Sequence, residues 1–316
     1  MREILITGGA GFIGSTLADK LLQENNKVIV VDNFNDYYDA RIKEQNIEKN
    51  INNPNYKLYR EDICNKEALR KIFAENKIDT VVHMAARAGV RDSIKKPFDY
   101  IHTNLYGTIN LLEGMKDFGV KKIVFASSSS VYGSCTLDEY VENFAANEPI
   151  SPYAATKLSC EQFIYTYSML YGIRAVCLRF FTVYGPRQRP DLVIYKFTEL
   201  MKNEKPIPVY GDGTTLRDYT YIDDIISGIC AAIDYNKTSY EIINLGSGKA
   251  YPLNEIIKYI ENALNKQAKI NYLPMQKGDM TKTISSISKA QKLLNYKPQT
   301  SIEDGIREFI KWFVKK

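Results

Sequence analysis

A tyrosine and a lysine stand four residues apart near the start of an expected helix. The segment SPYAATK, residues 151–157, places Tyr153 and Lys157 on one face of that helix. A phenol with a pKa near ~10 is a weak base at neutral pH, but a neighbouring ammonium group favours the phenolate and lowers that pKa. The pair could therefore accept a proton from a hydroxyl group of a substrate.

A run of four serines lies upstream of this pair. The segment SSSSVYG, residues 127–133, follows an expected strand, at the edge of a sheet where ligands bind. A hydroxyl there can bridge a substrate hydroxyl and the phenol of Tyr153. Each pattern alone also fits an ordinary surface, because YxxxK occurs on many exposed helix faces and serine runs are common polar loops. Their meaning depends on whether a ligand site lies beside them.

Three glycines near the amino terminus predict such a site. The segment GGAGFIG, residues 8–14, stands between an expected strand and an expected helix. Gly8 permits a tight turn, Gly11 lets the backbone approach a pyrophosphate, and Gly14 lets the helix pack closely on the strand. The amino terminus of that helix offers N–H groups and a positive dipole to phosphates. The alternative is a turn that serves only strand–helix packing.

Asp32 directly follows the second expected strand and favours a dinucleotide site. A carboxylate at this place can hold the ribose hydroxyls of adenosine, and it repels a 2′-phosphate. The sequence therefore predicts NAD rather than NADP. The positive nicotinamide ring would add to the effect of Lys157 on the phenol of Tyr153.

Strands and helices alternate through the first half of the chain and would position these residues. Apolar strands are expected at residues 3–7, 27–31, 56–60, 80–84, 122–126 and 174–179, and helices at 12–24, 67–75, 98–118 and 152–171. This alternation predicts an α/β fold, a Rossmann-type doubly wound parallel sheet with its ligand crevice at the carboxyl ends of the strands. Residues 33–53 are polar and are expected to form an irregular excursion.

The pattern changes after residue 185 to shorter elements with many prolines and glycines. Helices are expected near residues 192–202, 223–233, 253–264 and 302–313. We expect an NAD-binding Rossmann domain over residues 1–185 and a smaller, mixed α/β substrate domain mainly over residues 186–316. In an alternative division, parts near residues 220–250 return to the Rossmann domain.

The composition is that of an ordinary globular protein and excludes several classes. The net charge of +5, from 42 basic and 37 acidic residues, is a mild excess spread along the chain, so no nucleic-acid partner is expected. The five cysteines are far apart and the two histidines are His83 and His102, so we expect neither a disulfide framework nor a metal site. This cysteine usage favours the cytoplasm. No apolar run approaches ~18 residues, so no membrane insertion is expected.

The chain resembles an extended short-chain dehydrogenase/reductase of the NAD-dependent sugar-nucleotide epimerase and dehydratase group, and the match runs along nearly its whole length. It includes HMAA at residues 83–86, the Tyr153 and Lys157 pair, RDY at 217–219 and YIDD at 221–224. The resemblance implies that the adenine lies between Asp62 and Ile63. The NAD site that it implies consists of Gly8, Gly11, Phe12, Ile13, Gly14, Asp32, Asn33, Asp62, Ile63, Ala85, Ala86, Arg87, Asn104, Ser127, Tyr153, Lys157 and Phe181.

The residues after the catalytic serine distinguish the reactions of this group. Ser128 matches the catalytic Ser/Thr of the group; dehydratases place an Asp-Glu pair after it, and decarboxylating relatives place a Glu two residues after it. Ser129 and Ser130 stand there instead and cannot supply that acid–base chemistry at neutral pH. The resemblance therefore implies a C4 epimerase, in which Tyr153 takes the C4 hydroxyl proton and hydride passes to NAD and back. Tight retention of NAD is expected, because its loss in mid-cycle would strand the 4-keto sugar.

The segment RFFTVYGPRQRPD, residues 179–191, resembles UDP-glucuronate 4-epimerases, as do AGVR at 88–91 and MQKGDM at 275–280. Epimerases of UDP-glucose and UDP-N-acetylglucosamine usually carry Asn where Thr182 stands. The resemblance implies that Arg189 lies near a sugar carboxylate. It also implies a substrate site in which the serines contact the sugar and the last three residues hold the nucleotide: Ser128, Ser129, Ser130, Thr182, Arg189, Tyr210, Arg217 and Asp279. Lys277 replaces a proline that is usual in relatives, and Arg189 could instead be a surface arginine paired with a nearby acid.

Two other functions stay open. The same reaction on UDP-glucose or UDP-N-acetylglucosamine is the first alternative, and a catalytically silent regulator that senses NAD is a distant one. The helices expected at 98–118 and 152–171 carry more apolar residues than one sheet face needs. Relatives pair these helices in a four-helix bundle, so a homodimer is expected.

Overall fold

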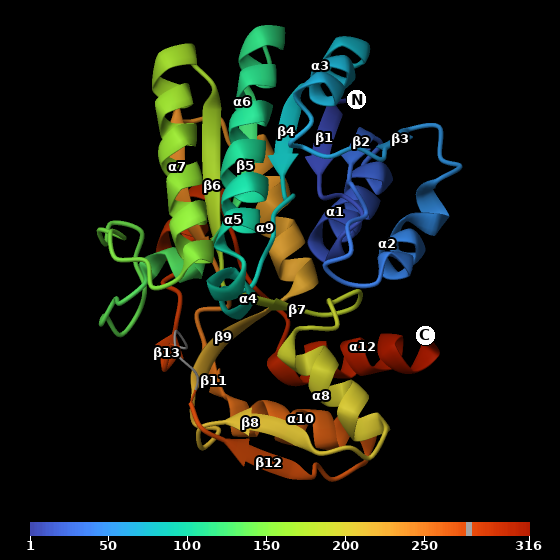
Figure 1. Ribbon diagram of the computed structural model, residues 1–316, viewed down its shortest axis with the longest axis vertical. Coiled ribbons are helices and arrows are strands. Elements are labelled where there is room, and N and C mark those ends of the chain that lie inside the picture. Colours follow the sequence, from blue (N-terminus) through green and yellow to red (C-terminus); the bar gives the residue numbers. More distant parts are fainter. Residues whose placement is uncertain (276–279) are drawn as a thin grey trace.

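Seven parallel strands form the central sheet of the computed structural model, which describes residues 1–275 and 280–316 (Figure 1). The strand order is β10-β6-β5-β4-β1-β2-β3, and the neighbouring pairs are parallel. This arrangement confirms the doubly wound α/β class. The strands are β1 (Glu3–Thr7), β2 (Lys27–Val31), β3 (Tyr56–Tyr59), β4 (Thr80–His83), β5 (Lys122–Ser128), β6 (Arg174–Phe180) and β10 (Tyr240–Leu245).

Helices cover both faces of this sheet because its strands are apolar on both sides. Along β2, Val28 and Val30 belong to one buried cluster, whereas Ile29 and Val31 belong to another on the opposite face. The first face is covered by α1 (Phe12–Gln23) and α9 (Ile222–Asp234). The helices on the second face are α3 (Lys66–Glu75), α6 (Gly107–Phe118) and α7 (Pro152–Tyr171).

The strand order reverses at β1, which lies between β2 and β4. Chain connections leave this point in opposite directions, so a crevice opens at the carboxyl ends of the strands. The glycine turn follows β1 and the serine run ends β5, and both therefore lie at this edge.

A smaller layer lies below the large sheet in Figure 1 and contains two short sheets. In the first, β9 (Leu216–Tyr221) pairs with β7 (Thr182–Tyr184), β11 (Ala250–Pro252) and β13 (Lys282–Thr283). In the second, β8 (Ile207–Tyr210) pairs with β12 (Ile270–Leu273). The helices of this part are α8 (Val193–Lys202), α10 (Leu253–Leu264) and α12 (Ile302–Lys315), whereas α11 (Ser288–Leu294) packs against α9 and β10 of the large sheet.

Residues 222–245 lie with the large sheet, because α9 packs on one of its faces and β10 forms its edge strand. A domain boundary at residues 185 and 186 stays a prediction. Among the described residues, no helix is both long enough and apolar enough to cross a membrane.

Three stretches differ from the sequence expectations. The helix expected over residues 98–118 is divided into α5 (Pro97–Tyr100), a π-helical segment (Ile101–Tyr106) and α6. Residues 33–53 were expected to be irregular, but they contain α2 (Ala40–Ile47) and a 3₁₀ turn (Glu48–Asn50). A further short helix, α4 (Val90–Lys95), was not expected.

Polar packing explains why the hydrophobic pattern of the sequence does not reveal α2. The side chain of Asp39 caps the helix by accepting a hydrogen bond from the backbone N–H of Arg41. Its inward side chains include Lys43 and Asn46, and Asn46 donates a hydrogen bond of 3.0 Å to the carbonyl of Ala10. Because these buried residues are polar, an apolar period does not reveal the helix.

Candidate active site

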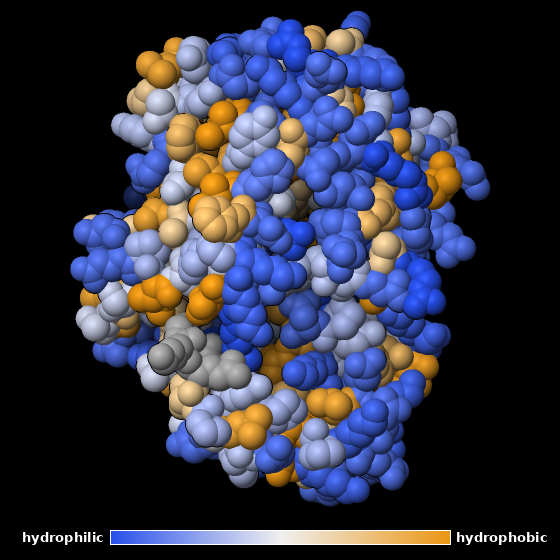
Figure 2. Space-filling model, in the orientation of Figure 1, coloured by the Kyte–Doolittle hydropathy of each residue, from blue (hydrophilic) through white to orange (hydrophobic). Residues whose placement is uncertain are grey.

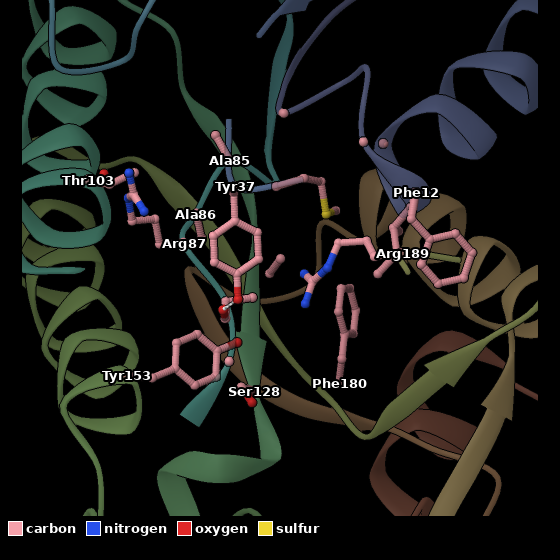
Figure 3. Close-up of a pocket in the computed structure, with 18 of the residues that line it drawn as sticks. Phe12, Tyr37, Ala85, Ala86, Arg87, Thr103, Ser128, Tyr153, Phe180 and Arg189 are labelled. Carbon is pink, nitrogen blue, oxygen red and sulfur yellow. Dashed lines mark hydrogen bonds between the residues drawn. The ribbon is translucent and has the colours of Figure 1, made fainter. Parts of the chain in front are cut away.

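One cavity of about 460 Å³ opens at the carboxyl ends of β1, β2, β4 and β5 (Figure 3). It brings together most of the residues that the sequence singled out. The predicted residues that line it are Gly8, Gly11, Phe12, Ile13, Gly14, Asp32, Asn33, Asp62, Ile63, Ala85, Ala86, Arg87, Ser127, Ser128, Ser129, Ser130, Tyr153, Lys157, Phe181, Thr182 and Arg189.

Among the residues that the structure describes, three predicted site residues do not line this cavity. Asn104 is buried behind it, where its carboxamide pairs with both backbone groups of Arg87 and donates to Thr156. Tyr210 ends β8, and Arg217 lies on β9, so both belong to the smaller layer. Asp279 lies outside the described residues.

The glycine turn is shaped by contacts that a side chain would break. Gly8 has a φ of +69°, and a Cβ there would lie 2.8 Å from the backbone of Ala85. A Cβ on Gly14 would lie 2.3 Å from the carbonyl oxygen of Gly8. Helix α1 begins at Phe12, and Gly11 gives its amino terminus no side-chain cap. The first N–H groups of α1 therefore face the cavity without an intrahelical partner, which suits a pyrophosphate.

Asp32 is buried at the end of β2 and is already surrounded by donors. Its carboxylate accepts hydrogen bonds from the backbone N–H groups of Ala10 and Phe34. It also forms a buried ion pair with Lys43, with 2.9 Å between Nζ and Oδ1. Sequence reasoning missed Lys43 because it lies eleven positions away on α2, a helix with no apolar signal.

A second carboxylate lies at the end of the cavity expected to hold adenine. Asp62 accepts hydrogen bonds of 2.7 Å from the Asn33 carboxamide and from the Cys64 backbone N–H. Burial works to raise the pKa of Asp62, but these hydrogen bonds outweigh it and lower that pKa. Asp32 and Asp62 thus lie at the places expected for the adenosine ribose and the adenine, and both of these groups carry hydrogen-bond donors. This arrangement fits NAD.

Tyr153 and Ser128 lie next to one another in the cavity (Figure 3). Burial raises the pKa of Tyr153, while a hydrogen bond with Ser128 and the positive charge of Arg189 act to lower it. Lys157 is buried one turn further along α7, and its Nζ donates a 2.7 Å hydrogen bond to the carbonyl of Ala126. Burial lowers the pKa of Lys157 to about 8. Burial therefore dominates the pKa of Tyr153, and the lowering expected from Lys157 together with a positive nicotinamide ring stays a prediction.

Three serines of the run have hydrogen-bond partners within the protein: Ser128 and Ser130 pair with each other, and Ser127 pairs elsewhere. Ser128 Oγ accepts hydrogen bonds from the backbone N–H of Ser130, at 3.2 Å, and from its hydroxyl, at 2.9 Å. Ser127 instead donates a 2.5 Å hydrogen bond to the buried carboxylate of Glu161. The hydroxyl of Ser127 is thus engaged by the protein, although the residue lines the cavity.

Arg189 projects into the cavity near Tyr37 (Figure 3). Its guanidinium forms two hydrogen bonds with Asp191, of 2.9 and 2.8 Å, and lies 5.5 Å from the centre of the Tyr37 ring. Arg189 is therefore paired with a nearby acid, as the alternative expected. Its guanidinium, however, faces the cavity and not the open surface. Tyr37 and Asp191 also line the cavity, and sequence reasoning missed both because polar loop residues carry no periodic signal.

The fold and this cavity define a class: a Rossmann-type protein with a glycine-rich dinucleotide turn and a Ser–Tyr–Lys group at the same sheet edge. A sequence model of the family described as GDP-mannose 4,6 dehydratase matches residues 5–309. The chain belongs to this family of short-chain dehydrogenase/reductase-type proteins.

Curated relatives and solved structures agree with this placement. The chain is 47% identical over 313 residues to a UDP-glucuronate 4-epimerase of Thermodesulfobacterium geofontis, covering 99% of this chain and 96% of that protein. A crystal structure of UDP-glucuronic acid 4-epimerase from Bacillus cereus, in complex with UDP-glucuronic acid and NAD, superposes with a TM-score of 0.93 at 39% identity and covers 99% of both chains. A UDP-glucose 4-epimerase of Thermotoga maritima, crystallised with UDP-glucose, has a TM-score of 0.92 at 33% identity, again over 99% of both chains.

Proposed function

We propose that this protein is an NAD-dependent epimerase that inverts C4 of a UDP-sugar, with UDP-glucuronate and UDP-galacturonate as its substrate and product. The observation that carries the proposal is the meeting of Tyr153, Ser128 and Arg189 in one cavity beside a dinucleotide turn. The curated and structural relatives that act on UDP-glucuronate support the choice of sugar.

The residues around the glycine turn would hold NAD. The amino terminus of α1 would bind the pyrophosphate, Asp32 the adenosine ribose, and Asp62 and Ile63 the adenine. NAD supplies a hydride acceptor that later returns the hydride to the sugar. Because a single bound NAD serves both half-reactions, we expect the protein to retain it tightly throughout the cycle.

Tyr153 is the proposed base and Ser128 its partner. The phenol, as phenolate, takes the proton from the C4 hydroxyl, and Ser128 holds that hydroxyl in line with it. After the resulting 4-keto sugar turns over about its diphosphate linkage, Tyr153 returns the proton. Lys157 contributes a positive charge behind the phenol, and its hydrogen bond to Ala126 fixes its position.

Ser129 and Ser130 distinguish this chain from the dehydration for which its family is named. Elimination of water needs an additional acid and base beside the sugar. Two hydroxyls stand where related dehydratases have carboxyl groups, so proton transfer at C5 and C6 lacks its catalysts. Oxidation and reduction at C4 remain.

Arg189 and the nearby hydroxyls would hold the sugar carboxylate. A guanidinium fork matches a carboxylate, and here it already holds one, that of Asp191. A substrate carboxylate would take the place of Asp191, with Ser129, Ser130 and Thr182 donating further hydrogen bonds. Oxidation at C4 makes the sugar a β-keto acid, which loses carbon dioxide readily. Hydrogen bonds that keep the carboxylate in the plane of the ketone misalign the breaking bond and protect it.

The experiment compares three UDP-sugars. The protein is incubated separately with UDP-glucuronate, UDP-glucose and UDP-N-acetylglucosamine, and the products are identified by NMR. Conversion of UDP-glucuronate to UDP-galacturonate without loss of carbon dioxide is expected. Preferential turnover of UDP-glucose would show that UDP-glucose, and not UDP-glucuronate, is the substrate. No turnover of any of the three would refute the proposed epimerase function.

We further propose a homodimer and a cytoplasmic location. Apolar side chains gather over α6 and α7 in Figure 2, and Phe98, Met169 and Leu170 are more than half exposed. An apolar face of this kind is typical of a protein interface.

The five cysteines are free thiols, which suits a reducing compartment. For the two layers we propose a division of labour, in which the large sheet binds NAD and the smaller one, mainly residues 186–316, binds the nucleotide-sugar.

A further inference from the structure

A buried ion pair lies directly behind the serine run. Arg179 on β6 and Glu161 on α7 have side chains that are 3% and 0% exposed. The guanidinium donates two hydrogen bonds to the carboxylate, from Nε to Oε1 at 3.0 Å and from Nη2 to Oε2 at 2.8 Å. Burying two charges costs more than packing two apolar residues in many proteins, so the pair is a poor device for stability alone.

The surroundings of Arg179 are consistent with this view. Its guanidinium lies 4.7 Å from the centre of the Tyr132 ring, and Tyr132 donates a 2.7 Å hydrogen bond to Asn244. The third nitrogen, Nη1, is buried and has no hydrogen-bond partner among the described residues. An incompletely satisfied buried cation adds further cost.

The pair is attached to the catalytic end of β5. Glu161 accepts the 2.5 Å hydrogen bond from Ser127, and Lys157, one turn earlier on α7, donates to the carbonyl of Ala126. Helix α7 therefore holds two consecutive residues of β5 immediately before Ser128. Tyr153, Lys157 and Glu161 are spaced four residues apart and lie along one stripe of the helix.

Glu161 is also the negative charge that acts on Lys157. The titratable groups that influence Lys157 are Cys160 and Glu161 on α7 and Cys177 on β6, and all three oppose the effect of burial. Burial raises the pKa of both thiols, which keeps them neutral.

Two further neighbours of Lys157, Phe125 and His83, carry no charge. Its ammonium group lies 4.8 Å from the centre of the Phe125 ring on β5. On β4, burial and then the charge of Lys157 lower the pKa of His83 to about 3, so the imidazole is neutral. Glu161 therefore supplies the formal negative charge.

We propose that Glu161, secured by Arg179, is a positioning residue for the epimerase: its carboxylate fixes Ser127, and hence the place of Ser128 opposite Tyr153, and it is the counter-charge of Lys157. The inference rests on the proposed function for its catalytic consequence. Arg179 holds Glu161 in place from the neighbouring strand. Nothing in this role requires either residue to touch the substrate.

The test uses Glu161→Gln, Glu161→Asp, Ser127→Ala and the double variant Glu161→Gln/Arg179→Met. For each, kcat and KM are measured from about pH 6 to 10, and urea unfolding is followed over the same range. Glu161→Gln leaves Arg179 buried without its partner, so this variant is expected to be unstable. The double variant removes both buried charges, regains stability, and so remains available if the single variant fails to fold.

The expected results separate positioning from structural support. In Glu161→Gln, the loss of activity at alkaline pH should begin about one pH unit lower than in the wild type, because Lys157 loses its counter-charge and deprotonates earlier. The stable double variant also loses the positive charge of Arg179, so its alkaline limit should shift in the same direction but by less. Its kcat should fall about tenfold with KM nearly unchanged. Glu161→Asp should keep the wild-type alkaline limit. Ser127→Ala should lower kcat without moving that limit.

The outcomes that would overturn the proposal are equally specific. A stable double variant with the wild-type alkaline limit and wild-type kcat would show that the ion pair serves only the fold. Unfolding provides an independent measurement, because the rise in stability that accompanies deprotonation of Lys157 should also begin at lower pH in the double variant. If the wild type epimerises no UDP-sugar, the proposed function fails, while the unfolding data still decide whether Glu161 is the counter-charge.

Discussion

The phenol of Tyr153 is buried, and burial raises its pKa, so its neighbours determine whether it can act as a base. The hydrogen bond with Ser128 and the charge of Arg189 are the two effects that oppose burial. The chemistry at this residue therefore depends on groups from β5 and from the loop before α8, as well as on Lys157 one turn away. Each can be changed separately.

Replacing Tyr153 by phenylalanine removes the proposed base and leaves the ring. We expect kcat for UDP-glucuronate to fall by about 10²–10⁴-fold, the range that general base catalysis supplies. Bound NAD, released by heat and measured enzymatically, should be unchanged, which serves as the control for an intact site. Wild-type turnover of this variant would remove the basis of the mechanism.

Arg189→Met tests recognition of the carboxylate. Loss of a charged, bidentate partner should raise KM for UDP-glucuronate by about ten- to a hundredfold, with little effect on UDP-glucose. Asp191→Asn is the matched variant. It removes the competing carboxylate that holds Arg189, so KM for UDP-glucuronate should fall or stay constant. Equal rises in KM for both sugars in Arg189→Met would place Arg189 away from the carboxylate. A fall in kcat for both sugars is expected in either case, because the charge of Arg189 also acts to lower the pKa of Tyr153.

Lys157 predicts how stability depends on pH. Burial lowers its pKa from 10.5 to about 8, so between these values the unfolded chain binds more protons than the folded protein, and stability rises with pH. Below pH 8 the buried charge costs about 3 kcal/mol. Lys157→Met should therefore be inactive yet more stable at pH 7, and the difference from the wild type should shrink by pH 10. Urea unfolding at both pH values measures this, and a variant less stable than the wild type at pH 7 would contradict it.

At the scale of elements, the glycine turn between β1 and α1 sets the distance between strand and helix. Gly14→Ala places a Cβ 2.3 Å from the carbonyl oxygen of Gly8, so α1 must move away from the turn. The purified variant should contain little NAD. Gly119→Ala is a suitable control, because Gly119 has a φ of +73° but open space around it. That variant should lose about 1 kcal/mol of stability and keep its NAD.

The sequence could predict elements whose signal is local. The strand at 27–31 and the helix at 152–171 lie where the apolar pattern and the Ser-Pro start placed them, and the glycine turn follows from its own residues. Helix α2 could not be found in this way, because Lys43 and Asn46 are buried through polar partners on other elements. The π-helical turn around Asn104 likewise depends on contacts with Arg87 and Thr156 that the local sequence does not reveal.

The same distinction holds for the site. Residues with a recognisable spacing, such as Tyr153 and Lys157, were found. Tyr37 and Glu161 were not, because each acts through a contact formed only when separate segments meet, with Ala88 and with Arg179. Asp191 is only two positions from its partner Arg189, but nothing in the loop sequence shows that it faces the cavity. Such partners become visible in three dimensions.

At the scale of the whole molecule, the apolar surface of α7 predicts association. Leu170→Glu places a charge on a side chain that is 66% exposed, next to Met169, which is 51% exposed. Sedimentation at micromolar concentration should show a dimer for the wild type and a monomer for this variant. Tyr272→Glu on β12 places the same charge on a residue that is 57% exposed in the smaller layer, and it should leave the dimer intact. A wild type that sediments only as a monomer would disprove the homodimer.

The pairing of β7 with β9 has a consequence for the length of the substrate. Thr182 lies opposite Tyr219 in this pairing, two residues beyond Arg217 on the same strand. If Thr182 contacts the sugar and Arg217 the diphosphate, a single short sheet fixes the distance between these two contacts. Hydrogen-bonded strands cannot slide independently, so this distance stays constant. The nucleotide end then stays anchored while only the torsions of the linkage change, so the ring can invert without release. A ligand with one phosphate fewer would contact either Thr182 or Arg217 but could not contact both.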